Sequence, residues 1–401
     1  MIRAHTLGHP RMGAQRELKF ALEQHWRGEL SAAELEDVGR ALRARHWAAQ
    51  RAAGLDFVTV GDFAFYDHVA NHVQLLGCEP PRFDFTADTP ELARYFAMAR
   101  GMGDAPSACG CGHRGSPALE MTKWFDTNYH YLVPEFLPDT EFHLASTRLL
   151  DEAAEARALG HAVKAVLIGP LTFLWLGKEK SVAFDRLDLL ERLLPAYGAV
   201  LARLKALGVE WVQLDEPVLG LDLAPAWRQA FEPAYSRLAA CGAKLLLATY
   251  FSPLIDNMRL ACQLPVAGLH VDAVRGAEDL PGALDWLPAH KLLSVGIVDG
   301  RNVWRTDLDA ALARLGAVAE KRGELWIAPS CSLLHVPVSL EAETGLDAEL
   351  KSWLAFAQEK LGELNELKRA LNGEPTDWRD RRSAWASRRA SPRVHRPAVA
   401  A

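Results

Sequence analysis

Short apolar or β-branched runs recur along the chain, and each is separated from the next by a longer stretch with helical character. This alternation predicts a parallel sheet whose strands are connected by helical crossovers. The predicted strands lie at residues 57–60, 129–133, 165–168, 211–214, 245–248, 269–271, 292–298 and 325–327, with a further run at 4–7. A closed barrel of this kind needs eight strands, so at least one of the nine runs must be an extra or capping strand.

Polar or glycine-rich groups follow many of these runs directly, which favours a barrel over an open sheet. In a (β/α)8 barrel the carboxyl ends of the strands form the functional face. The groups in question are Gly169-Pro170, Asp215-Glu216-Pro217, Thr249-Tyr250, Asp272, Asp299-Gly300 and Ser330-Cys331. We therefore predict an α/β fold of the (β/α)8, TIM-type barrel class.

The chain beyond the last predicted strand divides into a helical and a polar segment. Residues 346–371 carry an apolar stripe at helical spacing, and Gly373 and Pro375 end it. Residues 376–401 are rich in Arg, Ser, Ala and Pro and contain few core-forming residues. We predict a barrel domain with a C-terminal helix over residues 1–375 and a flexible, Arg-rich linker or tail at 376–401. A nucleic-acid-binding arm is the alternative for this tail.

Composition and charge exclude several classes of protein. The 401 residues are 49% hydrophobic and 24% charged, which is typical of a soluble globular protein. A net charge of −6 gives no bulk attraction to nucleic acid or to an anionic membrane, so an anionic ligand would need a local basic patch. The sequence begins without a secretory signal and contains no run of about 18 apolar residues. We expect a cytoplasmic protein that binds neither nucleic acid nor membrane.

The six cysteines are spread thinly through the chain, and we expect them to be reduced thiols. Cys109, Cys111 and His113 form a C-x-C-x-H sequence, but no second ligand cluster lies nearby, so a glycine-rich loop is favoured over a zinc site. Cys331 and His335 likewise lack an obvious set of partner ligands.

Two cations lie together near the start of a predicted helix. Arg16 and Lys19 share one face of this helix, Leu18 belongs to its apolar face, and Arg11 lies just upstream. Clustered cations at a helix N-terminus suit a polycarboxylate better than a neutral ligand. The alternative is a solvated basic face without a ligand.

Polar and aromatic side chains are unusually dense at residues 121–131, just where a strand is predicted to begin. Such a run can line a ligand groove. The alternative is a partly buried aromatic cluster from which Lys123 extends into solvent.

Asp215 and Glu216, at the end of a predicted strand, are a natural pair of carboxylates for acid and base catalysis. Adjacent strand residues point in opposite directions, however, so only one of the two can face the mouth of a barrel while the strand continues. A strand-end turn is therefore the preferred interpretation of this pair.

Several longer segments occur in an order that is shared with one known family. These segments are Thr6-Leu7-Gly8, Pro10-Arg11, Arg16-Glu17-Leu18-Lys19, Val60-Gly61-Asp62-Phe63, Tyr66-Asp67-His68 and residues 95–101, 120–131, 214–217 and 296–305. Together they resemble the N-terminal half of the cobalamin-independent methionine synthases, from about residue 4 to residue 372.

The resemblance implies a function and a set of binding residues. Enzymes of this family consist of two similar barrels, and they transfer a methyl group from 5-methyltetrahydropteroyl-polyglutamate to homocysteine, whose thiolate is held by zinc. The resemblance covers only the first barrel. It implies that Arg16, Glu17, Leu18, Lys19 and Lys123 bind the folate polyglutamate.

This sequence differs from the family at the residues that bind zinc. Catalytic barrels of the family carry a His-x-Cys pair at one strand end and a later cysteine in an Asn-Pro-Asp-Cys-Gly stretch. The corresponding residues here are 247–251 and 328–332, so that only Cys331 remains. A catalytic zinc site needs three protein ligands. We therefore expect no catalytic residue, metal or cofactor in this chain, with zinc confined to the full-length family enzyme, and we interpret Asp215, Glu216 and Cys331 as relics.

Three hypotheses follow. The chain is a folate-binding half that supports a catalytic barrel in the same chain or in another. It is a stand-alone binding or regulatory module. Or it is an independent barrel enzyme that uses Asp215, Glu216 or Cys331.

Overall fold

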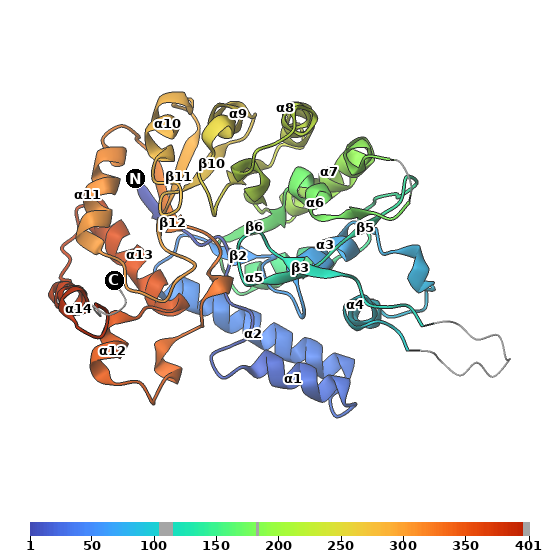
Figure 1. The fold of residues 1–401 in the computed structure, drawn as a ribbon, viewed down its shortest axis with the longest axis horizontal. Helices are drawn as coiled ribbons and strands as arrows, with labels where there is room; N and C mark the ends of the chain where they lie inside the picture. Colours follow the sequence, from blue (N-terminus) through green and yellow to red (C-terminus); the bar gives the residue numbers. More distant parts are fainter. Residues whose placement is uncertain (104–114, 182–183, 396–401) are drawn as a thin grey trace.

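The protein is built around eight parallel strands that curl around a common axis (Figure 1). The computed structural model describes residues 1–103, 115–181 and 184–395. The sheet order is β1-β12-β11-β10-β9-β8-β6-β2, so the first strand lies beside the last one, and the other neighbours in the sheet are successive barrel strands along the chain. The strands are β1 (Ile2–Ala4), β2 (Val58–Val60), β6 (Val163–Ile168), β8 (Trp211–Asp215), β9 (Lys244–Ala248), β10 (Gly268–Asp272), β11 (Leu292–Val298) and β12 (Leu325–Pro329).

Hydrogen bonds link the two outer strands of this sheet. The Asp56 N–H donates to the Ala4 carbonyl at 2.9 Å, and the Thr59 hydroxyl donates to the Thr6 carbonyl at 3.0 Å. On its other side β1 pairs with β12 in parallel. The predicted TIM-type barrel class is therefore confirmed.

The ninth predicted run, at residues 129–133, lies outside the barrel. It forms β4 (His130–Leu132), which pairs antiparallel with β3 (Met121–Lys123) in a separate hairpin. The expectation that one run would be an extra strand is confirmed. A second small sheet joins β5 (Glu135–Phe136) to β7 (Lys178–Glu179).

Helices surround the barrel and bury apolar faces against it (Figure 1). Those between the first strands are α1 (Glu17–Trp26), α2 (Ala32–Ala52), α3 (His68–Leu75), α4 (Glu91–Arg100) and α5 (Arg148–Ala158). The remaining crossovers contain α6 (Pro170–Leu176), α7 (Leu190–Ala206), α8 (Pro225–Ala239), α9 (Met258–Gln263), α10 (Asp279–Trp286) and α11 (Leu308–Ala319). No helix in the described ranges is long and apolar enough to cross a membrane.

The interior of the barrel contains a hydrogen-bonded polar network. Lys164 is fully buried, and its ammonium group donates to the Gln213 side chain. Gln213 in turn donates from Nε2 to Asp215 Oδ1 at 2.6 Å. Separately, the Ser294 hydroxyl lies 2.7 Å from His5 Nε2 and 2.9 Å from His270 Nδ1. Because buried polar groups are costly when unpaired, this network fixes the side chains that lead up to Asp215.

The prediction of one continuous helix at residues 346–371 is wrong. The segment forms α12 (Ala348–Trp353) and α13 (Ala357–Leu371), separated by an extended stretch. Within this stretch the Ala355 N–H donates to the Val303 carbonyl at 2.8 Å, and Leu354 pairs with Trp304 in an isolated bridge. A contact with a distant segment thus overrides the local helical pattern.

The segment expected to be a tail contains a helix that its composition did not predict. Helix α14 (Arg379–Ala390) buries none of its residues, although Trp378 before it is 6% exposed. Ion pairs attach it to the barrel: Arg381 lies 2.6 Å from Glu366, and Arg382 lies 2.7 Å from Asp309.

The two ends of the barrel domain are joined. The Ile2 N–H donates to Asn372 Oδ1 at 3.1 Å, and Asn372 Nδ2 donates back to the Ile2 carbonyl at 3.0 Å. The Met1 ammonium group donates to the Gly323 carbonyl at 3.0 Å. The start of the chain is therefore fixed between the start of β12 and the end of α13.

Candidate functional site

A cavity of about 520 Å³, here called the groove, opens near the carboxyl ends of β1 and β2. Its volume is in the range of small-molecule sites. One wall is the loop that follows β1 together with the start of α1, and the opposite wall comes from residues 334–343 after β12. The charged and polar residues that line it include His9, Arg11, Arg16, Lys19, Asp62, His68, Tyr129, Ser339 and Glu343.

Three cations lie along the groove. Arg16 and Lys19 are exposed at its rim, and the Lys19 ammonium group is 3.7 Å from Glu23. Arg11 lies in the wall, where its guanidinium donates to the carbonyls of Ala64 and Phe65 at 3.2 and 2.9 Å. The structure therefore brings together the three cations that the sequence placed near one helix start.

The backbone at the start of α1 is held in an unusual conformation. Arg16 has a φ of 60°, in the left-handed region that is uncommon for residues other than glycine. Glu17 fixes the loop in front of it: Oε2 accepts from the Gln15 N–H at 2.9 Å, and Oε1 accepts from Arg45 at 2.7 Å. A residue held in a sparsely populated conformation is often part of a functional site.

The other residues predicted to bind the substrate are placed differently. Leu18 is fully buried in the core, and both carboxylate oxygens of Glu17 are engaged within the protein. Lys123 is exposed on β3, opposite His130, and is not among the residues that line the groove. The binding roles of these three residues stay predictions.

A second, smaller cavity, here called the chamber, lies behind the groove at the mouth of the barrel. It has a volume of about 30 Å³, which is enough for one water molecule. Asp62, His68 and Leu334 line both cavities, so the chamber adjoins the inner end of the groove. The chamber is also lined by Trp124, Asp215, Tyr250 and His335.

The two adjacent carboxylates after β8 point in opposite directions. Asp215 lines the chamber, where it accepts from Gln213 and from the Tyr250 hydroxyl, the latter at 2.9 Å, and burial raises its pKa to about 6. Glu216 is turned away from the chamber and is fully buried.

Glu216 accepts hydrogen bonds from four surrounding groups. These are the Leu171 N–H at 3.2 Å, the Thr172 N–H at 2.7 Å, the Thr172 hydroxyl at 2.5 Å and the Tyr235 hydroxyl at 3.0 Å. Burial raises the pKa of Glu216 to about 7, although these donors act in the opposite direction. Glu216 therefore joins the start of α6 to α8, and the two carboxylates do not form a catalytic pair.

Sequence reasoning missed several residues at the inner end of the groove. Asp62 lies just beyond the end of β2, separated from it by Gly61, and the carboxyl end of a strand is where a barrel carries its functional residues. From the sequence, Asp62 was named only within the segments that resemble the family. The His68 ring lies 4.5 Å from that of Trp124 and 5.3 Å from that of Tyr129, between centroids. Burial lowers the pKa of His68 well below its usual range, so the ring is neutral.

The residues at the family's zinc position do not fit a metal site. Cys331 is fully buried, its thiol donates to the Ser332 carbonyl at 3.6 Å, and burial raises its pKa well above the usual value. Within the described ranges, no three His, Cys, Asp or Glu side chains form a group that could hold a metal ion. Cys109, Cys111 and His113 lie outside the described residues.

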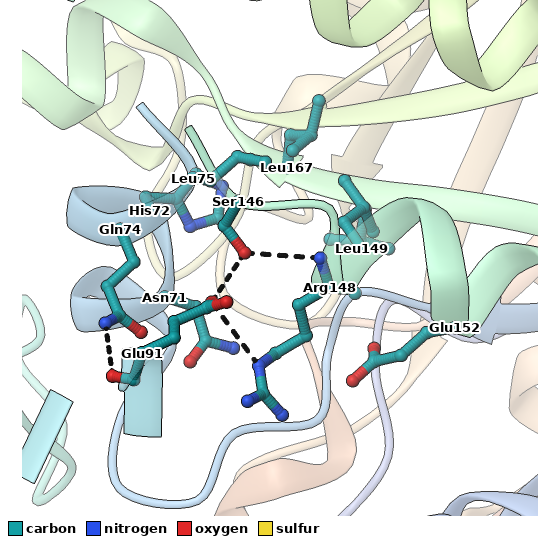
Figure 2. A pocket seen from close by; sticks show the side chains of 12 residues that line it. Asn71, His72, Gln74, Leu75, Glu91, Ser146, Arg148, Leu149, Glu152 and Leu167 are labelled. Carbon is teal, nitrogen blue, oxygen red and sulfur yellow. Dashed lines mark hydrogen bonds and ion pairs between the residues drawn. The ribbon is translucent and has the colours of Figure 1, made fainter. Parts of the chain in front are cut away.

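Another small cavity lies beside α3 and α5, and Figure 2 shows its lining. Its volume is also about 30 Å³. The Ser146 hydroxyl donates to Glu91 at 2.6 Å, and Gln74 donates to the Glu91 carbonyl at 2.8 Å. Arg148 pairs with Glu36 at 2.7 Å. These groups are largely satisfied by one another, so this cavity is a weaker candidate than the groove.

The chain matches one known family over most of its length. Residues 3–323 match the N-terminal domain of the cobalamin-independent synthases. The chain belongs to this family. The resemblance inferred from the short segments is thereby confirmed, and methionine biosynthesis by methyl transfer is the activity of the family.

Solved structures of related enzymes share the fold. A B12-independent methionine synthase from Shewanella sp. W3-18-1, in complex with selenomethionine, has a TM-score of 0.61 and 13% identity, over 86% of this chain and 91% of the other. A protein from Listeria monocytogenes assigned as a vitamin-B12-independent methionine synthase has a TM-score of 0.58 and 13% identity, over 94% and 100% of the two chains. A methyltransferase from Methanosarcina mazei has a TM-score of 0.52 and 12% identity, over 83% and 86%.

Proposed function

We propose that the groove binds the glutamate tail of 5-methyltetrahydropteroyl-polyglutamate, and that the chain is the substrate-binding half of a cytoplasmic cobalamin-independent methionine synthase. The observation that carries this proposal is the convergence of Arg11, Arg16 and Lys19 on one groove in a member of this family.

The charge of the groove suits a ligand with several carboxylates. A single exposed ion pair contributes only about 0.2–1 kcal/mol, so one carboxylate would bind weakly. A tail with several carboxylates engages several cations at once. The N-terminal end of α1, where Arg16 lies, adds a favourable partial positive charge. Binding of this kind weakens as salt screens the charges.

Methyl transfer itself is assigned to a second, zinc-bearing barrel, in the same protein or in a partner. This chain has one buried thiol at the corresponding place and no group of ligands among its described residues. Homocysteine and zinc are accordingly assigned to that second barrel, and this chain is expected to form no methionine alone.

Calorimetric titration with 5-methyltetrahydropteroyl-triglutamate tests the binding. The double variant Arg16→Ala/Lys19→Ala should weaken the affinity about tenfold or more at low salt, as expected for the loss of two charged contacts. The matched control is Arg27→Ala/Lys244→Ala, which removes two exposed cations elsewhere. Equal affinities for the two double variants would exclude the groove as the tail site.

A turnover assay tests whether the chain needs a separate catalytic barrel to form methionine. The chain is supplied with homocysteine, the folate, zinc and reductant, with and without a separately produced catalytic barrel of the family. Product only on complementation supports a substrate-binding half. Product from the chain alone would show that it assembles a working active site, and the loss of that activity in Asp215→Asn would then favour an independent enzyme.

A further inference from the structure

The turn before α1, which places the two cations at the rim of the groove, has a strained backbone. Arg16 has a φ of 60°, and residues other than glycine rarely adopt this left-handed conformation. Such a conformation persists where the surrounding contacts hold it. The contacts that hold this turn therefore also decide where Arg16 and Lys19 point.

Glu17 makes one of these contacts from the first position of α1. Its Oε2 accepts the Gln15 N–H at 2.9 Å and so bridges the residue with the positive φ. The same carboxylate lies against Gly13, where a Cβ atom would collide with Oε2. Gly13 has a φ of 79°, so this position needs glycine both for its backbone and for the space that Glu17 occupies. The Glu17 side chain thus packs against one end of the turn and binds the other.

Arg45, on α2, holds the Glu17 carboxylate from outside the turn. Its Nη2 donates to Glu17 Oε1 at 2.7 Å. Helix α2 is itself fixed to the barrel, because the buried Trp47 donates from Nε1 to the carbonyl of Thr59 in β2 at 2.9 Å. Arg45 therefore connects the turn to the wall of the barrel. Neither Arg45 nor Glu17 is among the residues that line the groove.

The charge of Glu17 is unsuited to direct contact with the proposed ligand. The glutamate tail carries carboxylates, and a carboxylate of the protein at the same place would repel them. Both oxygens of Glu17 already accept hydrogen bonds from the protein. The place of this acid beside two cations that face an anion is explained if it holds the turn.

This inference rests on the proposed function of the groove. We propose that Arg45 and Glu17 are positioning residues for the glutamate tail. Arg45 orients the Glu17 carboxylate, and Glu17 holds the turn, so that Arg16 and Lys19 face the groove before the ligand arrives. Neither Arg45 nor Glu17 touches the ligand. Side chains that are ordered in advance lose less conformational entropy on binding, so two residues outside the groove raise the affinity for the tail.

The test compares two ligands that differ only in the length of the tail. These are 5-methyltetrahydropteroyl-triglutamate and the corresponding monoglutamate, and their affinities for the whole chain are measured by calorimetry. The ratio of the two affinities reports on the tail site alone. The variants Glu17→Gln and Arg45→Gln each remove the charged hydrogen bond between α1 and α2. Glu23→Gln is the matched control, because it removes an equal charge from α1 at a position 3.7 Å from Lys19.

Positioning and simple charge predict opposite effects of Glu17→Gln. If charge alone acted, the loss of a carboxylate near an anionic tail would strengthen binding, as we expect for Glu23→Gln. Positioning predicts that Glu17→Gln and Arg45→Gln each lower the affinity ratio about two- to tenfold, which is the effect expected when one or two side chains must be ordered on binding. The double variant should lose no more than either single variant, because the two residues act through one hydrogen bond.

An affinity ratio that is unchanged or higher in Glu17→Gln, or losses that add in the double variant, would overturn the inference. The effect of Arg16→Ala/Lys19→Ala would still report on the tail site in that case. A wild-type chain that binds the triglutamate no more tightly than the monoglutamate would overturn the proposed function, and this inference with it.

Discussion

Arg301 fixes the turn of the β3–β4 hairpin to the mouth of the barrel through Asp126. The guanidinium donates from Nη1 to Asp126 Oδ1 at 2.7 Å and from Nη2 to the Asp126 carbonyl at 3.0 Å. It also lies 5.1 Å from the centre of the Phe251 ring. Phe125 and Phe251, whose rings are 6.1 Å apart, both have positive φ values, of 49° and 82°. Because bulky residues rarely adopt this conformation, the turn needs such contacts to hold it in place.

Arg301→Gln should therefore loosen the hairpin without unfolding the barrel. We expect faster amide hydrogen exchange across residues 121–132 and a loss of about 1–2 kcal/mol in the free energy of unfolding, because a charged hydrogen bond and a cation–π contact are removed. Arg27→Gln, which breaks an exposed ion pair with Glu29, is the control and should leave the hairpin unchanged. Unaltered exchange in Arg301→Gln would show that the hairpin is held by its strand contacts alone.

Glu216→Ala should destabilise the protein by about 2–4 kcal/mol, because it leaves the buried donors of Leu171, Thr172 and Tyr235 without their acceptor. Urea unfolding measures this loss. Glu210→Ala, at an exposed pair with Lys244, should cost less than about 1 kcal/mol. Similar losses for the two variants would contradict a structural role for Glu216.

His46 should make the protein sensitive to acid. Burial lowers its pKa in the folded protein to about 2, and its ring lies 4.6 Å from that of His9. Below about pH 6.5 the unfolded chain binds a proton that the folded chain excludes, so stability is lost as the pH falls. Between pH 6.5 and 4, the free energy of unfolding of His46→Leu should therefore fall less steeply than that of the wild type, by about 1.4 kcal/mol for each pH unit.

Unfolding of wild type and His46→Leu at a series of pH values measures the difference. Parallel profiles for wild type and His46→Leu would rule out the contribution of His46.

Helix α14 should dissociate from the surface of the barrel at high salt. It buries no residue and is attached in part by the ion pairs Arg381–Glu366 and Arg382–Asp309. At about 1 M salt the screening length falls to about 3 Å, and exposed pairs weaken accordingly. Limited proteolysis within residues 379–390 should become faster, whereas α13, which buries Leu361 and Leu364, should stay protected. Salt-independent cleavage would show that Trp378 and its apolar contacts hold the helix instead.

The barrel could be predicted from the sequence because its strands are buried on both faces and read as continuous apolar runs. The strand β3 could not, because Met121, Thr122 and Lys123 are all exposed and show no apolar signal. The break between α12 and α13 was also hidden, since it depends on a backbone contact with Val303, about fifty residues away.

The candidate site was predicted in part. Arg16 and Lys19 share a helix face, so local spacing was enough to place them together. The opposite wall of the groove comes from residues 334–343, which only the closure of the barrel brings beside the start of α1. Asp62 was missed for the same reason, because its neighbours in the site are distant in sequence. Leu18, by contrast, lies in a matching motif and is a core residue.

The pair of hydrogen bonds between Ile2 and Asn372 has a consequence for the synthesis of the protein. Strand β1 is synthesised before the other strands of the barrel, but its partner β12 begins at Leu325, and Asn372 lies farther still along the chain. At roughly 5–20 residues per second, the free edge of β1 waits on the order of 20–70 seconds for these partners. The nascent chain therefore carries a strand with one unpaired edge through most of its synthesis, and an unpaired strand edge is a template for wrong pairing with another chain.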